Sequence, residues 1–186
     1  MPPKTTGPTT AALTAALRSV DRALAAKAAS GDGKPAELAA CHGATLFQRA
    51  VWAATTLVPA GKVATYKTIA EWSRRLVAAE QQLPAAAAAA GDPPVRATGQ
   101  ALKRNPLAPA PVPCHRVVAA GGKIGGFCGS TGAAELSRKC ALLLAERVEL
   151  RDPFGKPRSA QGAGKKQKAA AAERVAATVV AERCVL

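Results

Sequence analysis

Apolar residues recur at regular helical spacing from position 46 of the 186-residue chain. Thr45 precedes this run, and Pro59 and Gly61 follow it. The apolar positions of the run are Leu46, Phe47, Ala50, Val51, Ala54 and Leu57. Because a threonine caps a helix N-terminus and this spacing gives the helix one apolar face, the pattern predicts a core helix here.

Three further helices are predicted downstream. Thr65 caps one from Tyr66 to about Val77, and another runs from about Pro94 to Lys103, where Asn105-Pro106 ends it. These two short helices indicate a helix-turn-helix. The long join at 78–93, which includes the alanine run 85–90, is predicted to be an Ala-rich insertion on the outer surface.

The last predicted helix spans about 133–147. An inward apolar face is formed by Leu136, Cys140, Leu143 and Leu144, whereas Arg138, Lys139 and Arg147 are expected in water. Before it, 117–120 and 123–124 are predicted as two strands joined by Gly121-Gly122, which makes a β-hairpin. The predicted fold class is therefore mainly α, a winged helix-turn-helix with a small β-hairpin wing.

Composition divides the chain into three parts. Residues 1–43 are rich in Ala, Pro and Gly, so we expect a flexible segment with one amphipathic helix near 11–29. Residues 44–154 form the predicted winged-helix domain, and 155–186 form a basic tail rich in Ala and Lys. A chain of this length with 3% aromatic residues favours one core domain with sizeable tails.

Charge points to a polyanionic partner. The net charge is +14 and the isoelectric point about 10.2, which favours nucleic acid, although membrane surfaces also attract basic proteins. No apolar run is long enough to span a bilayer. The five cysteines show no paired spacing, so we expect a reducing intracellular compartment.

The strongest chemical signal is Pro113-Cys114-His115-Arg116, which contains one of only two histidines. A thiol attacks as its thiolate, and a neighbouring imidazole or cation promotes that form. The alternative is that Cys114 is a small buried residue leading into a strand. A second pair, Cys41-His42, has no partner pair that would complete a metal site, so no metal is predicted.

The segment Pro113–Val118 resembles the catalytic Pro-Cys-His-Arg-Val signature of O6-alkylguanine-DNA alkyltransferases. Asn105-Pro106 resembles the hinge of that family, and Gly125–Gly129 resembles its substrate-pocket loop. The resemblance covers about 46–149. It implies DNA repair by single-turnover transfer of a methyl or alkyl group from O6-alkylguanine to a cysteine, after minor-groove binding and base flipping.

Residue roles follow from the resemblance. The implied catalytic group is Cys114 as alkyl acceptor, His115 as base through a water, Glu146 as the carboxylate that orients His115, and Tyr66 as the group that helps guanine leave. The implied substrate-binding residues are Val117, Cys128 and Asn105. The implied DNA contacts are Tyr66, Arg96, Ala97, Gly99, Lys103, Arg104 and Arg116, with Arg96 filling the stack left by the flipped base.

The resemblance also implies the partners and setting. We expect a monomer that acts without cofactor on double-stranded DNA containing O6-alkylguanine, with O4-alkylthymine as a further candidate lesion. The expected location is the nucleus, and an organelle transit peptide is the alternative for the N-terminus. Two departures from the family are Cys128, where a serine or another small residue is common, and the usual N-terminal α/β domain, which is not recognisable in this sequence.

Two other classes of protein remain open at this point. A noncatalytic alkyltransferase-like sensor would bind lesions without repair, but such relatives replace the cysteine that this chain keeps at Cys114. A basic winged-helix chromatin protein would account for the tails rich in Ala, Lys and Pro. Transfer of a labelled alkyl group from DNA to the protein separates the alternatives.

Overall fold

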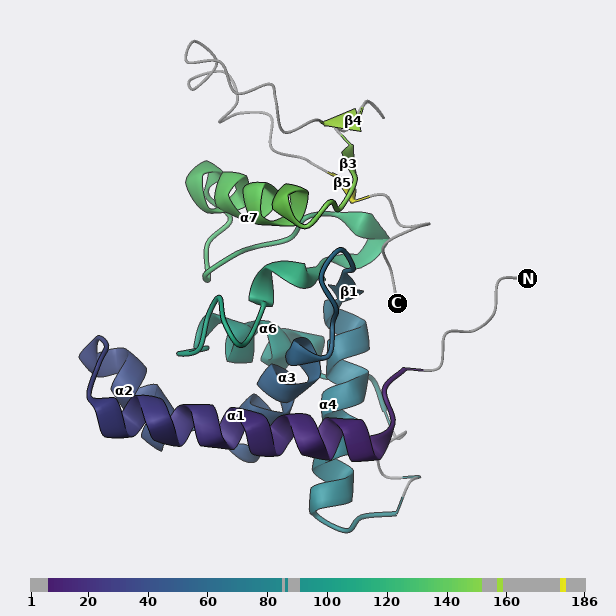
Figure 1. Ribbon diagram of the computed structural model, residues 1–186. Coiled ribbons are helices and arrows are strands. Elements are labelled where there is room, and N and C mark those ends of the chain that lie inside the picture. The colour runs from purple at the N-terminus through teal and green to yellow at the C-terminus, as the bar shows by residue number, and fades with distance from the viewer. Residues whose placement is uncertain (1–6, 85, 87–90, 152–156, 159–177, 180–186) are drawn as a thin grey trace.

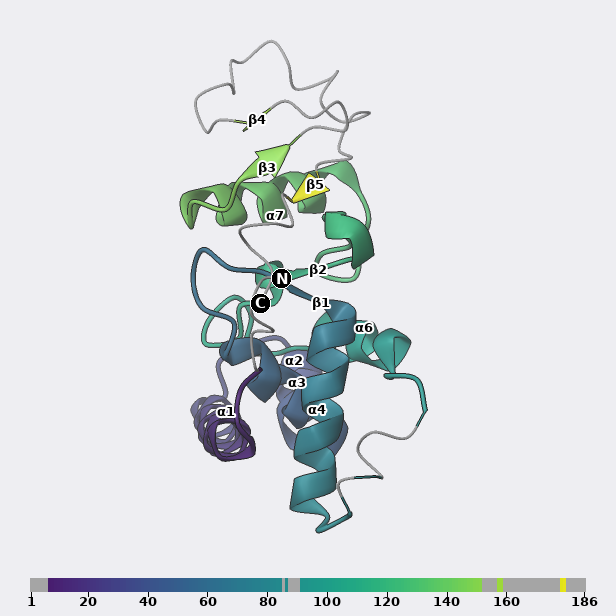
Figure 2. The same cartoon turned by 90° about the vertical axis from the view of Figure 1, so that its right-hand side faces the viewer.

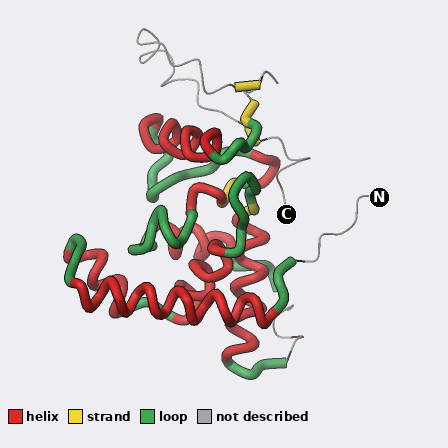
Figure 3. The backbone as a smooth tube through the Cα atoms, viewed as in Figure 1, coloured by secondary structure: helices red, strands yellow, loops and turns green. Residues whose placement is uncertain are grey.

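A computed structural model describes residues 7–84, 86, 91–151, 157–158 and 178–179. Helices dominate it, as Figure 3 shows. They are α1 (Thr10–Ser30), α2 (Pro35–His42), α3 (Leu46–Thr56), α4 (Tyr66–Glu80), α6 (Val95–Lys103) and α7 (Ala133–Ala145), with 3-10 turns η1 (Cys114–Arg116) and η2 (Ala120–Gly122). The predicted mainly α fold is confirmed.

Capping explains where the central helices begin. The Thr45 hydroxyl accepts a hydrogen bond from Gln48 N, and the Gln48 side chain accepts one from Thr45 N, which makes a capping box at the start of α3. Thr65 Oγ1 accepts from Thr68 N in the same way at the start of α4. Both helices begin where the sequence predicted.

The β structure differs from the predicted hairpin. Strand β2 (Val117–Val118) pairs with β1 (Ala64–Thr65) in parallel, with Ala64 opposite Val117. Both β2 residues are buried, which suits a strand covered on two sides. The chain then turns through η2, where a backbone hydrogen bond of 2.8 Å joins Ala119 N to Lys123 O. The two-stranded hairpin was wrong because β1 supplies the partner that a local return strand was expected to provide.

Beyond α7 lies a second small sheet. Strand β3 (Leu150–Arg151) pairs antiparallel with β4 (Pro157–Arg158) and with β5 (Thr178–Val179). Apart from β4 and β5, the predicted basic tail 155–186 lies outside the described residues. Figure 2 shows the β1–β2 pair between the helical body below and α7 above.

Two apolar clusters hold these layers together. The larger one joins α1, α3, α4 and α6 around the fully buried Trp52, and it reaches Cys114 and Phe127. The smaller one packs α7 against the strands; its buried members are Val63, Val118, Ile124, Cys140, Leu143, Val148 and Leu150. The candidate nucleophile therefore lies at the boundary between the helical body and the α7 layer.

The N-terminal region bears out the helix that was predicted near 11–29. That helix is α1, α2 follows it, and α1 lies across the base of the helical body (Figure 1), in a segment that was expected to be flexible. Leu13, Leu17, Val20 and Leu24 are buried in the larger cluster. Their spacing of three or four residues is helical, but the many alanines between them make the apolar stripe look weak.

The predicted insertion is described only in part. Helix α4 continues to Glu80, beyond the predicted end near Val77, and residues 85 and 87–90 lie outside the described residues. None of the helices in the described ranges combines the length and apolarity that a membrane crossing requires.

We expect Leu17→Ala to lower the free energy of unfolding by about 2–5 kcal/mol, the usual cost of truncating a buried leucine. Leu17 is 4% exposed within the main core, whereas Leu83 is 47% exposed, so Leu83→Ala is the matched control. Urea unfolding of both variants measures the difference. Equal, small effects would mean that α1 is an appendage and not part of the core.

Candidate active site

Cys114 is delivered by a short, rigid segment. It is the first residue of η1, follows Pro113, and is 8% exposed. Its N–H donates to Val112 O at 2.9 Å, and Arg116 N donates to Pro113 O at 3.0 Å. Since β2 follows directly, the cysteine is fixed from both sides.

The Cys114 side chain opens into a pocket of about 260 Å³ between α4, α6 and the loop 126–131. This volume is just below that of typical pockets for drug-sized ligands, so it suits one small ring system. The lining residues are Tyr66, Gly99, Gln100, Leu102, Lys103, Cys114, Gly126, Phe127, Cys128, Gly129, Ser130 and Thr131.

The Cys114 thiol is protonated in the resting protein. Burial raises its pKa to about 11, and the neighbouring Cys128 adds to the rise, whereas the charge of Lys139 opposes it. At neutral pH the resting group is therefore a thiol and not a thiolate. Nucleophilic chemistry at this position requires a base that removes the proton when substrate is bound.

His115 and Glu146 supply a base and its orienting carboxylate. His115 is 5% exposed, and its Nε2 lies 2.9 Å from Glu146 Oε1. A carboxylate at Nε2 favours the tautomer with the proton on Nε2, which leaves the lone pair on Nδ1. Nδ1 is buried, and no group of the described residues hydrogen-bonds with it. It is therefore the nitrogen of His115 that can accept a proton.

Arg116, a predicted DNA contact, binds Glu146 within the protein. Its Nε and Nη2 donate to the Glu146 carboxylate at 2.7–3.1 Å, and its Nη1 donates to Val58 O at 2.6 Å. Burial alone would raise the pKa of Glu146, but hydrogen bonds from Arg116 and His115, together with the positive charge of Arg116, lower it to about 2. Arg116 thus keeps Glu146 ionised, and its guanidinium is engaged with Glu146 and with the Val58 carbonyl.

Tyr66 lies at the pocket wall, in the first turn of α4. Its hydroxyl donates to Gly126 O at 3.3 Å, and burial raises its pKa. A Cβ at Gly125 would come within 3.3 Å of the Tyr66 ring, at a backbone φ of +67° that favours glycine. Gly99 faces the other ring edge at ordinary contact distance. The predicted glycines of α6 and the pocket loop therefore make room for the Tyr66 ring.

Lys139 is a residue of the site that sequence reasoning missed. It was predicted to be in water, but it is 0% exposed, and its ammonium donates to Val117 O and Ile124 O at 2.6 Å and to Gly126 O at 3.1 Å. Burial lowers its pKa to about 8. The signal was present, since Lys139 lies three residues after Leu136 and four before Leu143 on the inward face.

One face of α6 is basic and exposed. Its buried residues are Thr98, Ala101 and Leu102. Its exposed residues are Val95, Arg96, Ala97, Gln100 and Lys103, and the C-cap residue Arg104 is exposed as well. Of the predicted DNA contacts, Arg96, Ala97, Lys103 and Arg104 thus share a surface, whereas Gly99 faces Tyr66. Gln100, at the pocket edge, was not predicted. A basic face with a small residue suits close approach to a phosphate backbone.

The predicted substrate-binding residues are separated by the structure. Cys128 lines the pocket, is exposed, and has a φ of +50°. Val117 is buried, and its carbonyl accepts from Lys139. Asn105 does not line the pocket: its Oδ1 accepts from Leu107 N at 2.9 Å, and it borders a different cavity between α2, α3 and the end of α6.

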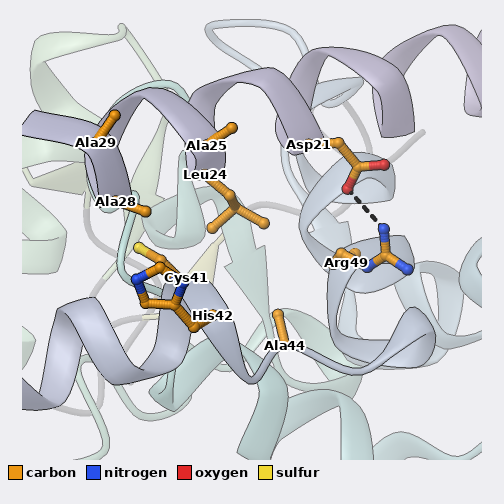
Figure 4. Close-up of a pocket in the computed structure, with 9 residues that line it drawn as sticks. All are labelled: Asp21, Leu24, Ala25, Ala28, Ala29, Cys41, His42, Ala44 and Arg49. Atoms are coloured by element: carbon orange, nitrogen blue, oxygen red, sulfur yellow. Dashed lines mark hydrogen bonds and ion pairs between the residues drawn. The ribbon is translucent and has the colours of Figure 1, made fainter.

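A cavity of about 660 Å³ lies elsewhere, between α1, α2 and α3 (Figure 4). Cys41 and His42 form part of its wall, and Asp21 pairs with Arg49 at 2.9 Å. Burial raises the pKa of Cys41, which makes its thiol less reactive. Within the described residues, no group of three His, Cys, Asp or Glu side chains could hold a metal.

We expect Glu146→Gln to change how stability depends on pH. The folded pKa of about 2 lies below the ordinary 4.5, so ionised Glu146 stabilises the fold above pH 4.5, and this contribution is lost as the pH falls from about 4.5 to about 2. Urea unfolding between these pH values should show a smaller loss in Glu146→Gln than in the wild type. Glu80→Gln, at an exposed position, is the control; a wild-type slope in Glu146→Gln would contradict the ion-pair account.

Known proteins are similar to this chain in sequence. The sequence profile described as "6-O-methylguanine DNA methyltransferase, DNA binding domain" matches residues 46–148, which include α3, α6, Cys114 and Glu146. The methylated-DNA–protein-cysteine methyltransferase of Mycolicibacterium paratuberculosis is 41% identical over 101 residues, 54% of this chain and 48% of its own length. The constitutive enzyme of that name from Bacillus subtilis is 35% identical over 124 residues, 66% of this chain and 62% of its own length.

A solved structure is also similar. It is that of S. pombe Atl1 in complex with damaged DNA containing O6-carboxymethylguanine, with 29% identity and a TM-score of 0.42 over 61% of this chain and 87% of that one. This chain spans about half the length of the mycobacterial relative. The family match over residues 46–148 confirms the resemblance that the Pro-Cys-His-Arg-Val signature indicated. The chain belongs to the 6-O-methylguanine DNA methyltransferase family, and residues 46–148 are its DNA-binding domain.

Proposed function

We propose that this chain repairs DNA by moving a methyl or alkyl group from O6 of guanine to Cys114. The observation that carries the proposal is a buried thiol in a pocket sized for one ring system, beside a histidine that a carboxylate orients. The curated relatives bear the name of this activity, which supports the same conclusion.

Proton transfer comes first in the proposed reaction. Because burial holds Cys114 as a thiol, His115 accepts its proton at Nδ1, through one water. Glu146 remains ionised beside Nε2 and stabilises the imidazolium that forms. The positive charge of Lys139, which lowers the pKa of Cys114, favours the thiolate as well.

Alkyl transfer then follows by displacement at the alkyl carbon. A bond forms from Cys114 Sγ to that carbon, and the bond from the carbon to guanine O6 breaks. The electron pair goes to guanine, which takes up a proton from water and stays in the DNA as the neutral base, while His115 returns the thiol proton to water, so that one proton passes in total from the thiol to guanine. Tyr66, whose hydroxyl lies in the pocket wall, donates to the guanine ring as the charge develops. No cofactor enters this sequence of steps.

DNA approaches along the exposed face of α6. Lys103 and Arg104 contact phosphates, and the small Ala97 lets the helix enter the minor groove. A base inside a duplex cannot reach Cys114, so the damaged nucleotide must be flipped into the pocket. Arg96, at the start of α6, fills the space that the nucleotide leaves. The pocket loop at Cys128 borders the flipped base, with its amide as donor.

The same proposal includes a monomer that acts in the nucleus, with O4-alkylthymine as a second candidate lesion. A noncatalytic lesion sensor would use the same pocket and the same face of α6, and Cys114 is what favours transfer over sensing. A chromatin protein has no need for a nucleophile beside an oriented histidine.

We expect one methyl group per chain, on Cys114, after reaction with excess duplex DNA that contains radiolabelled O6-methylguanine. The thioether offers no leaving group comparable to guanine, so the thiol is not regenerated. Peptide mass mapping locates the label. Cys114→Ala should take up none, and Cys128→Ser, which changes the other pocket thiol, should still take up one on Cys114. Turnover beyond one methyl per chain, or labelling of Cys114→Ala, would disprove the assignment.

We expect Arg96→Ala to slow the reaction with duplex DNA by about tenfold, or about 1.4 kcal/mol of the few kcal/mol that flipping costs. Reaction with free O6-benzylguanine should change less than twofold, because a free base needs no extrusion. Rates on both substrates measure this, with Arg22→Ala, an exposed arginine of α1, as the charge-matched control. Equal losses on the two substrates would remove Arg96 from the flipping step.

A further inference from the structure

The turn after α6 connects the DNA-facing helix to the nucleophile. Asn105 N donates to Leu102 O at 3.3 Å, and Leu107 N donates to the Asn105 side chain at 2.9 Å. Val112 N then donates to Leu107 O at 3.4 Å, just ahead of η1. The position of this turn therefore decides how the face of α6 lies relative to the pocket.

Lys27, near the end of α1, binds this turn directly. Its ammonium donates to Pro106 O at 2.7 Å and to Glu37 Oε2, on α2, at 2.8 Å. Pro106 itself is buried. One cation thus joins α1, α2 and the turn, and a charged donor makes a stronger bond to a carbonyl than a neutral one does.

Two other contacts hold the end of α6 from other sides. Trp52 Nε1, on α3, donates to Ala101 O at 2.9 Å in a buried setting. The Lys103 stem packs against the pocket loop so closely that a Cβ at Gly129 would lie 2.6 Å from it. Both contacts lie within residues 46–148, whereas Lys27 and Glu37 lie outside that range. The Lys27 contact is therefore made by a part of the chain that the family domain does not include.

We propose that α1 and α2 form a clamp on the turn after α6, and that Lys27 is the positioning residue that holds this turn in place for reaction with DNA. The clamp is the Lys27–Glu37–Pro106 contact. In addition to packing in the core, the N-terminal helices thus fix the position of the basic face of α6 relative to the pocket.

The clamp matters most when DNA is the substrate, and this part of the inference rests on the proposed function. A duplex must contact the exposed face of α6 while its flipped base occupies the pocket, so both parts must keep one relative position. A free base contacts the pocket alone. The pocket side of α6 stays anchored by Trp52 and by the Lys103–Gly129 contact when Lys27 is lost.

The test compares Lys27→Met with Lys34→Met. Both remove one positive charge from the N-terminal helices, so both change the attraction to DNA in the same direction. Lys34 is exposed. Its backbone carbonyl accepts hydrogen bonds from the first turn of α2, and the substitution leaves this carbonyl unchanged. Lys27→Arg should restore the contact to Pro106. Glu37→Gln removes the ion pair that orients Lys27, and it serves as a milder variant in case Lys27→Met does not fold.

Amide hydrogen exchange of the free protein tests the clamp without relying on any activity. We expect the amides of Arg104, Asn105 and Leu107 to exchange at least fivefold faster in Lys27→Met than in the wild type, less so in Glu37→Gln, and at the wild-type rate in Lys34→Met and Lys27→Arg. Unchanged exchange in Lys27→Met, or an equal rise in Lys34→Met, would overturn the clamp even if the protein repairs DNA.

Single-turnover rates test its consequence. Lys27→Met should react with duplex O6-methylguanine DNA at least fivefold more slowly than Lys34→Met and with free O6-benzylguanine within twofold of it. Equal losses on both substrates would show that Lys27 supports the whole fold and does not position α6, which overturns the proposal. If the wild type reacts with neither substrate, the proposed function fails, and the exchange measurement still decides the clamp.

Discussion

Burial of the Cys114 thiol is the constraint on which the rest of the site depends. A thiol taken out of water holds its proton more tightly, and the pKa of about 11 puts the reactive form out of reach at neutral pH unless other groups assist. The same burial excludes bulk water and leaves one open side, the pocket. The fold therefore needs a base next to the thiol, a fixed partner for that base, and a wall that admits one ring.

Glu146 is the fixed partner for that base, and its carboxylate makes a second contact as well. It orients His115 and takes the guanidinium of Arg116, whose other end reaches Val58 O in the link after α3. The carboxylate at the end of α7 is thus joined to the helical body through Arg116. Burial disfavours the ionised form of Glu146, but the hydrogen-bond donors around its carboxylate outweigh this effect and lower its pKa. Glu146 is therefore ionised beside His115 at neutral pH.

Lys139 shows how the pocket loop keeps its shape. A buried ammonium that donates to three carbonyls is costly to desolvate, and the depressed pKa of about 8 expresses that cost. In exchange, one side chain fixes β2, the turn before the loop, and Gly126, to which Tyr66 also donates. A polar network of this kind tolerates few changes, because each lost partner leaves a buried carbonyl unpaired.

Local rules let the sequence alone determine the starts of α3 and α4, the approximate extent of α6 and α7, and the family with its candidate nucleophile, because caps, spacing and a contiguous signature depend on near neighbours. Only the tertiary structure decided that α1 belongs to the core, that β2 pairs with β1, that Lys139 is buried, and that Arg116 binds Glu146. Each of these outcomes depends on a partner far along the chain. Arg116 carries the same charge whether it binds a DNA phosphate, as predicted, or the Glu146 carboxylate, as observed. The packing of α7, and not the neighbours of Arg116 in sequence, brings Glu146 to it.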